Sequence, residues 1–354
     1  MRYEVHLACI VFSRNDLEQI ENCRPYVKSI ITTYINPHIA KARCLLHLFS
    51  KKPFTIHCFY SKKFKELLRY QDFDVVLVDC SSMAQYAIDI EKPKIIDFVD
   101  IDSDKWKLYS RHSWPPKSLI YYMEYRRLQL FEKDITKQFN FCLVVSEGEK
   151  KLLQDDEKVV IIPNGIDLEF FVPRAQQNDN TLIFTGAMDY FPNIDGVSYF
   201  YRDIWPLVKE HIQDVRFIVA GMSPSPKIRA LANEDTTITG FVSDIRSCLA
   251  QATVCVVPLR LAKGIQNKIL EAMAMGIPVV ATTAANAGIK ARDKHQILVA
   301  DSPEDFARSV LMLLKDPHLR KTIADNARQF VQENFSWGRN LGKLDELITQ
   351  LTEK

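Results

Sequence analysis

The stretch GIQNKILEAMAMGIPVV, residues 264–280, places one lysine and one glutamate inside an otherwise apolar segment. The pattern predicts a helix that begins near Ile265 and stops at Gly276, because a proline follows. Lys268 and Glu271 are three residues apart and therefore share one helix face. Two interpretations are open at this point. The pair is either a surface salt bridge, or a site in which Lys268 contacts a diphosphate and Glu271 accepts two hydroxyls of a ribose.

Two more junctions between an apolar strand and a helix contain a glycine. Gly186 lies in TGAMDYFPN and Gly221 in GMSPSPK. A glycine at such a point lets a ligand approach the backbone closely, although an ordinary connecting loop fits the first junction equally well. The second junction lacks both G-x-G-x-x-G and G-x-x-x-x-G-K-[ST], so neither a dinucleotide-binding fold nor a P-loop is indicated.

A cluster of carboxylates follows a strand in the first half of the chain, in DFVDIDSDKW, residues 97–106. Aspartates in this position commonly cap the following helix. Ser146 and Glu147 end another strand in a similar way.

Secondary-structure elements must hold these residues in position. Short β-branched runs alternate with longer helical segments along the chain, as in βαβ units with parallel sheets. The turn-rich runs at 163–167 and 173–180 suggest a domain boundary. We expect an α/β protein with two doubly wound parallel-sheet domains, residues 1–168 and 169–335, then a C-terminal helix, 336–354, packing back toward the first domain. The expected strands are Val5–Phe12, Ser29–Tyr34, Val75–Asp79, Ile95–Phe98, Cys142–Ser146, Val159–Pro163, Thr181–Thr185, Arg216–Ala220, Thr236–Thr239, Val254–Pro258, Val279–Thr282 and Ile297–Val299.

The composition limits the class of protein. The formal net charge is +2, so no overall field favours nucleic acid as a partner. A local basic segment, residues 41–69, faces either anionic lipid, a phosphate-bearing acceptor, or solvent. The 8 cysteines form no C-x-x-C pair and are expected to be reduced core residues of a cytoplasmic protein. No signal peptide or membrane span is expected.

At the level of whole motifs, the sequence resembles a known family. G-x-x-x-K-x-x-E-A-M-A-x-G-x-P-V-V with the upstream GFVSD resembles the nucleotide-binding half of family 4 glycosyltransferases of the GT-B fold, in which two Rossmann-like domains face across a cleft. GAMDYFPNIDGV, GFVSDI, GIQNKILEAMAMG and DFVDIDSDKW together look like bacterial exopolysaccharide-associated sugar transferases. The resemblance runs from residue 1 to about residue 345.

The resemblance implies roles for individual residues. Glu271 corresponds to the second glutamate of the family's Glu-x7-Glu motif, which binds ribose, while Lys263 stands where the first glutamate is usual. Asp100 or Asp102 would orient or deprotonate the acceptor hydroxyl. Asn193 falls near the position where many relatives have an arginine or lysine on the diphosphate. Because Asn193 is neutral, Lys268 and Arg260 become the candidates for that phosphate contact. The donor-binding set that the resemblance implies is Gly186, Asn193, Phe241, Val242, Lys263, Gly264, Ile265, Gln266, Asn267, Lys268 and Glu271.

Relatives begin with a further strand and a glycine-rich loop, which we do not find before EVHLACIVF, so we expect weak or absent transfer with nucleotide binding retained. The expected function is retaining transfer of a sugar from a UDP- or GDP-linked donor to an exopolysaccharide, capsule or lipopolysaccharide acceptor, glycan or lipid-linked. We expect no metal or cofactor and a place in the cytoplasm, with peripheral contact to the inner membrane. The alternatives are a catalytically impaired nucleotide-sugar-binding protein and a UDP-sugar epimerase.

Overall fold

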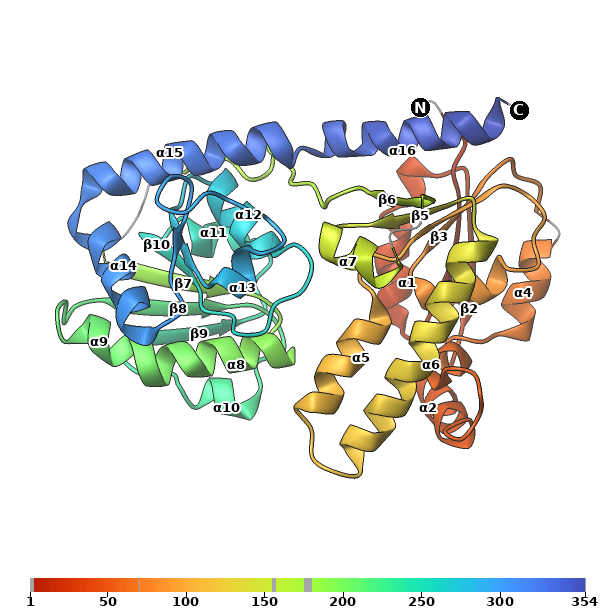
Figure 1. The fold of residues 1–354 in the computed structure, drawn as a ribbon, viewed down its shortest axis with the longest axis horizontal. Coiled ribbons are helices and arrows are strands. Elements are labelled where there is room, and N and C mark those ends of the chain that lie inside the picture. The colour runs from red at the N-terminus through yellow and green to blue at the C-terminus, as the bar shows by residue number, and fades with distance from the viewer. Residues whose placement is uncertain (1–2, 70, 155–156, 175–179, 354) are drawn as a thin grey trace. The chain divides into compact units, whose positions relative to one another are not determined.

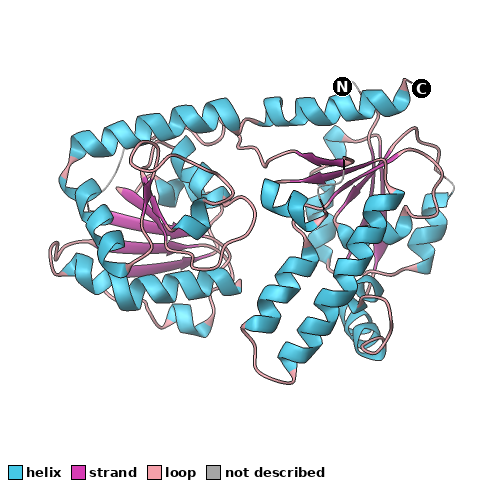
Figure 2. Ribbon diagram, in the orientation of Figure 1, coloured by secondary structure: helices cyan, strands magenta, loops and turns pink. Residues whose placement is uncertain are grey.

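The computed structural model describes residues 3–69, 71–154, 157–174 and 180–353. The chain forms two compact units. The first comprises Met1–Ile161 with Asp345–Lys354, and the second comprises Ile162–Leu344. Figure 2 shows helices flanking parallel strands in both units. The expected α/β class is therefore confirmed.

The first unit contains two parallel sheets (Figure 1). Strands β1 and β2 pair with each other, and the second sheet has the order β3-β4-β5-β6. The elements of the first unit are β1 (His6–Val11), α1 (Arg14–Glu21), a 3-10 helix (Arg24–Tyr26), β2 (Ser29–Tyr34), α2 (Pro37–Leu46), α3 (Phe54–Cys58), α4 (Lys62–Arg69), β3 (Val76–Asp79), a second 3-10 helix (Ser81–Tyr86), β4 (Lys94–Asp97), α5 (Asp102–Arg111), α6 (Lys117–Gln138), β5 (Phe141–Val144), α7 (Glu147–Leu152) and β6 (Val159–Ile161).

The core of this unit forms where apolar residues of the four-stranded sheet meet the helices. Ile96, Phe98, Ile135 and Phe139 are all buried in one cluster. Helix α6 is amphipathic, and its inner face carries Leu128 and Ile135 but also two buried glutamates. Burying carboxyl groups costs free energy unless they are hydrogen-bonded or neutral, so both call for an explanation.

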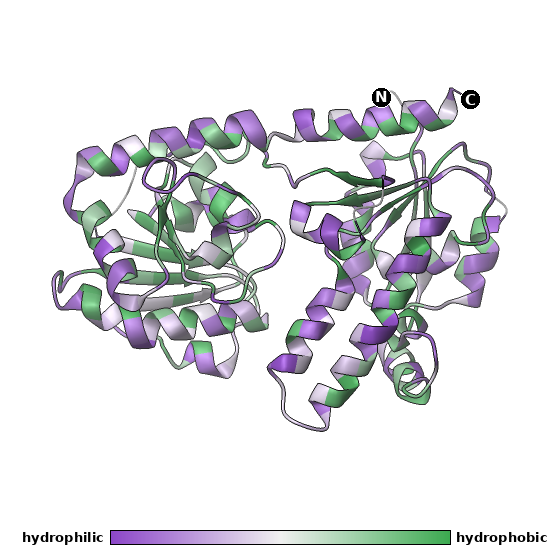
Figure 3. Ribbon diagram, in the orientation of Figure 1, coloured by the Kyte–Doolittle hydropathy of each residue, from purple (hydrophilic) through white to green (hydrophobic). Residues whose placement is uncertain are grey.

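The second unit has one six-stranded parallel sheet of order β12-β11-β10-β7-β8-β9. Every residue of β7 and of β10 is buried, as expected for strands covered by helices on both faces. Figure 3 colours these strands in the hydrophobic green. The elements are β7 (Thr181–Thr185), α8 (Phe191–Tyr199), a π-helical turn (Phe200–Ile204), α9 (Trp205–Lys209), β8 (Arg216–Ala220), α10 (Pro226–Arg229), β9 (Thr236–Gly240), α11 (Ile245–Leu249), β10 (Val254–Val257), α12 (Asn267–Ala274), β11 (Val279–Ala281), α13 (Thr283–Asn286), β12 (Leu298–Val299), α14 (Pro303–Lys315), α15 (Pro317–Asn334) and α16 (Trp337–Thr352), the last of which continues into the first unit.

The junction between the units differs in place from the turn-rich runs in the sequence. The units divide between Ile161 and Ile162. Ile166 forms a β-bridge with Ser336, and a Cβ at Gly165 would lie 2.4 Å from the Trp337 ring, so the run at 163–167 is tied into the second unit. The other run lies largely outside the described residues.

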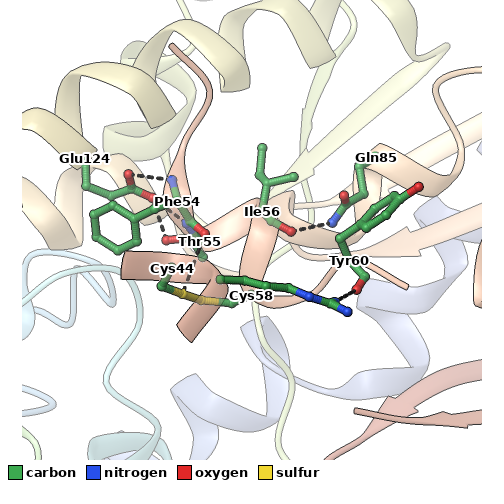
Figure 4. Close-up of a disulfide and its surroundings, with 9 residues drawn as sticks. Cys44, Phe54, Thr55, Ile56, Cys58, Tyr60, Gln85 and Glu124 are labelled. Atoms are coloured by element: carbon green, nitrogen blue, oxygen red, sulfur yellow. Dashed lines mark hydrogen bonds between the residues drawn. A yellow bond between two sulfur atoms is a disulfide. The ribbon is translucent and has the colours of Figure 1, made fainter. Parts of the chain in front are cut away.

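The cysteine prediction needs two corrections. Cys23 is exposed and is therefore not a core residue. Cys44 and Cys58 form a disulfide that joins the end of α2 to α3, with their Cα atoms 5.6 Å apart (Figure 4). The two short helices pack together and bring the sulfur atoms into contact, which a spacing of 14 residues does not announce. Cys142, Cys248 and Cys255 are buried free thiols, as predicted.

Within the described residues no helix has both the length and the apolar character needed to cross a bilayer.

Candidate functional site

The carboxyl end of the second unit's sheet brings two glycine loops into contact. Gly186 follows β7 with φ 151°, and Gly221 follows β8 with φ 145°. A Cβ at Gly221 would lie 1.8 Å from the carbonyl oxygen of Gly186, so only glycine fits there. The two loops therefore form one packed surface at the edge where parallel α/β sheets bind ligands.

Lys268 is buried beneath this surface. Its Nζ donates a hydrogen bond to Oδ1 of Asn193 over 2.6 Å and lies 4.4 Å from the centre of the Phe184 ring. Asn193 in turn donates from Nδ2 to the carbonyl oxygen of Ala187 over 2.9 Å. Lys268 thus positions Asn193, and Asn193 positions the loop that contains Gly186.

The charge of Lys268 is not balanced by a carboxylate within the described residues, since none lies within ion-pairing distance of its Nζ. Desolvation lowers the pKa of Lys268 to about 8, while Cys255 and Glu271 oppose that shift. A buried ammonium group without a carboxylate partner is costly and is suited to an anionic ligand.

Glu271 lies one helical turn further along α12 and is partly buried. No described residue donates a hydrogen bond to its carboxylate or forms an ion pair with it. Desolvation raises the pKa of Glu271, and Lys268 partly offsets the rise. The surface salt bridge that the sequence left open is therefore not formed, and the carboxylate is free to accept hydrogen bonds from a ligand.

The residues before α12 form a turn in which Gly264 packs closely against Gly288. A Cβ at Gly288 would lie 2.0 Å from the carbonyl oxygen of Gly264. Ile265 is buried, and Gln266 donates from Nε2 to the carbonyl oxygen of Lys263 over 2.8 Å. The helix begins at Asn267, two residues later than predicted, because this turn takes up Ile265 and Gln266.

Other donor-side residues lie at the surface or in separate contacts. Phe241 is 76% exposed and follows Gly240 at the end of β9, while Val242 is partly buried. Asn267 is exposed and accepts a hydrogen bond from Asn164 over 3.2 Å. Lys263 is exposed. Arg260 forms an ion pair with Asp195 on α8, so it is not a free phosphate contact.

The carboxylates of the first unit gather at the carboxyl ends of β3, β4 and β5. Val99 has φ 60°, a strained value for a β-branched residue, and its N–H donates to Oδ1 of Asp97 over 2.9 Å. Asp100 is exposed as a residue in this turn. Its carboxyl group is nevertheless partly desolvated at the strand ends, and this desolvation raises the pKa of Asp100. Asp102 accepts a hydrogen bond from the hydroxyl of Ser81. Asp100 and Asp102 thus differ: the first is open to a ligand, and the second has a partner in the protein.

Sequence reasoning missed two glutamates near this turn. Glu149 accepts a hydrogen bond from the N–H of Val145, and desolvation, with a contribution from Asp100, raises the pKa of Glu149 to about 7. Glu132 accepts from the N–H of Ser103, and desolvation raises the pKa of Glu132 to about 8. The Ser-x-x-Glu spacing of Ser146 and Glu149 is a capping signal that could have indicated the first. Nothing in the sequence distinguishes Glu132.

Within the described ranges, no group of three or more histidine, cysteine, aspartate or glutamate side chains is arranged to hold a metal ion.

Comparison with known proteins identifies a family for part of the chain. Residues 179–316 match the model of the family described as glycosyl transferases group 1. The chain is 22% identical over 248 residues to a UDP-Gal:α-D-GlcNAc-diphosphoundecaprenol α-1,3-galactosyltransferase of Escherichia coli, and the match covers 64% of each chain. For the first three curated relatives the matches span 60%, 58% and 64% of the relatives' own lengths.

Solved structures share the fold over nearly the whole chain. The sucrose-phosphate synthase of Thermosynechococcus elongatus superposes with a TM-score of 0.71, 15% identity and 98% coverage of both chains. The Anabaena protein HepE, solved in complex with UDP-glucose, superposes with a TM-score of 0.69 and 14% identity, covering 98% of this chain and 99% of HepE.

Proposed function

Because residues 179–316 form a glycosyl transferases group 1 domain in a chain of the GT-B fold, we propose that the protein is a retaining glycosyltransferase. It moves a sugar from a nucleotide-sugar donor to a surface glycan. The second unit binds the nucleotide, and the first unit binds the acceptor.

The observation that carries this proposal is the free carboxylate of Glu271 beside the buried ammonium group of Lys268. A carboxylate accepts two neighbouring ribose hydroxyls, and charge-assisted hydrogen bonds of this kind are the strong ones. The ammonium group and the packed loop at Gly186 lie where a diphosphate would be bound. Phe241, with its exposed ring, provides a surface against which a base stacks.

The donor we propose is UDP- or GDP-linked, and the names of the similar proteins favour UDP. HepE was solved with UDP-glucose, and the Escherichia coli relative is named for UDP-galactose. The same relative is named for an undecaprenyl-diphosphate-linked acceptor, which supports a lipid-linked acceptor for this chain and hence peripheral contact with a membrane on its cytoplasmic face.

On the acceptor side we assign the general base to Asp100 rather than to Asp102. Asp100 is exposed with a raised pKa, whereas the carboxylate of Asp102 already accepts the Ser81 hydroxyl. A carboxylate with a raised pKa is better matched to removing a proton from an acceptor hydroxyl. No metal or other cofactor enters this proposal.

The test is a transfer assay on the full chain with UDP-glucose, UDP-galactose, UDP-N-acetylglucosamine and GDP-mannose, using an undecaprenyl-diphosphate-linked sugar as acceptor. Mass spectrometry detects the product, NMR reads its anomeric configuration, and a parallel reaction contains EDTA. We expect transfer from one donor with retention, unaffected by EDTA and slow, in keeping with the weak transfer expected from the sequence. Donor binding without transfer would instead support a nucleotide-sugar-binding protein, and an epimeric nucleotide sugar would support an epimerase.

A further inference from the structure

One exposed tip of the first unit is both apolar and cationic. The α2 tip, as we call residues 45–52, comprises the last two residues of α2 and most of the loop to α3. It carries Leu45, Leu46 and Phe49, which are 72%, 81% and 85% exposed. Lys51 and Lys52 follow after one serine and are exposed too. Large apolar side chains are rarely left this open in a row without a function.

The tip is held in place at its base, so its exposure is not the result of loose packing. The Cys44–Cys58 disulfide closes the segment (Figure 4). Arg127 of α6 donates from Nη1 to the carbonyl oxygen of Leu48 over 2.7 Å. The buried carboxylate of Glu124 accepts the N–H groups of Phe54 and Thr55, each over 2.9 Å. These contacts fix the two ends and the middle of the segment, while its three large apolar side chains stay exposed.

The charged side chains of the tip and of its neighbours in sequence are all cationic. Residues 22–65 contain no aspartate or glutamate. Lys41, Lys51 and Lys52 have no acidic partner among the described residues, whereas Lys62 and Lys65 on α4 pair with Glu66 and Asp89. The cations beside the apolar residues are therefore available to an anionic surface.

We propose that the α2 tip inserts into the interface of an anionic lipid bilayer. Lysines that flank a small apolar tip match the arrangement of headgroups above acyl chains. A stable protein partner needs about 800 Å² per side, more than three side chains on a protruding tip offer. The turn between α5 and α6 lies toward the same end of this unit as α2 in Figure 1. It contains Trp114, which is 88% exposed and of a residue type enriched at membrane interfaces.

This inference deepens the proposed function, because a lipid-linked acceptor is held in a bilayer. It can nevertheless fail independently, since the tip lies in the first unit and the donor-binding residues lie in the second.

The test is flotation of the full chain with vesicles of phosphatidylcholine alone and of an equal mixture with phosphatidylglycerol, without nucleotide. We expect binding to the anionic vesicles, weakened by salt. Leu46→Ser with Phe49→Ser should reduce binding at least tenfold. Lys51→Gln with Lys52→Gln should also reduce it roughly tenfold or more, because each lysine contributes about fivefold near an anionic surface.

The matched control is Met312→Ser on α14, a residue 46% exposed in the second unit, which should leave vesicle binding unchanged. UDP binding by each tip variant should equal that of the parent chain. This measurement shows that the variant is folded, and it tests the donor site independently of vesicle binding. Equal binding to neutral vesicles, no binding by the parent chain, or undiminished binding by the Leu46/Phe49 variant would overturn the proposal. If the parent chain instead self-associates without binding vesicles, and the Leu46/Phe49 variant does not self-associate, the tip would be assigned to contact with a second copy of the chain.

Discussion

At the scale of single residues, the proposed donor site depends on two charges in unequal surroundings. Glu271 is partly buried without a partner, and Lys268 is buried with one neutral partner, Asn193. The sequence showed that the two charges share a helix face but not which of them was enclosed. Enclosure depends on Phe184 and Asn193, which come from β7 and α8 and are far away in the sequence.

The first prediction concerns the pH dependence of nucleotide binding. The pKa of Lys268 is lowered to about 8, so the ammonium group loses its proton as the pH rises through 8, while a diphosphate is already fully ionised. UDP affinity should therefore fall roughly tenfold between pH 7 and pH 9. Calorimetric titration measures it, and Lys268→Met should bind UDP weakly with little pH dependence in this range. A parent chain whose affinity is constant up to pH 9 would contradict the assignment.

A second prediction concerns Glu132 of α6, whose pKa is raised to about 8 from 4.5. The native state therefore holds a proton that the unfolded state releases, so the free energy of unfolding should decrease as the pH rises from 4.5 to 8, by a few kcal/mol at most. Glu132→Gln keeps an oxygen to accept the N–H of Ser103 and carries no charge. Urea unfolding should find this variant more stable than the parent chain at pH 8 and the pH dependence reduced. Unchanged pH dependence would show that Glu132 does not hold the proton.

At the scale of elements, contacts between strand-to-helix loops shape the proposed donor site. The Gly186 and Gly221 loops lie backbone against backbone at the carboxyl ends of β7 and β8. The Gly186 loop accepts a hydrogen bond from Asn193, and Asn193 accepts one from Lys268 of α12, so the loops are connected to that helix.

The third prediction compares two glycines of positive φ. Gly221→Ala places a Cβ 1.8 Å from a backbone oxygen, whereas Gly240→Ala, with φ 67°, meets nothing within 4 Å. The second change should cost only ~1–2 kcal/mol of unfolding free energy. The first should cost about 3 kcal/mol or more and should weaken UDP binding, because the loops must separate. Thermal unfolding with and without UDP measures both, and equal losses in the two variants would show that the loops are not in contact.

Much of the element structure was predictable because its signals are local. Ser29–Tyr34, Thr181–Thr185 and Arg216–Ala220 are strands with exactly the expected bounds, since β-branched runs between turn residues specify them. The start of α12 was displaced by a turn held through Gly288, which is distant in sequence. The disulfide and the burial of Glu132 also arise from packing between elements, and no local sequence pattern predicts such packing.

At the scale of the whole molecule, our proposal assigns different tasks to the two units. Every proposed donor-binding residue lies in Ile162–Leu344, and the carboxylates proposed for the acceptor lie in the first unit, as does the α2 tip. The family match covers residues 179–316, most of which belong to the second unit, and the proposed transfer depends first on the proposed nucleotide binding by that unit.

The most direct test is calorimetric titration of the full chain and of Glu271→Ala with UDP, with Glu210→Ala, an exposed glutamate at the end of α9, as the matched control. Hydrogen bonds to a charged group contribute about 1.5–3 kcal/mol, so Glu271→Ala should weaken UDP binding roughly tenfold to a hundredfold. Glu210→Ala should bind as the parent chain does. Full UDP affinity in the Glu271→Ala variant would contradict the ribose assignment and with it the proposed donor site.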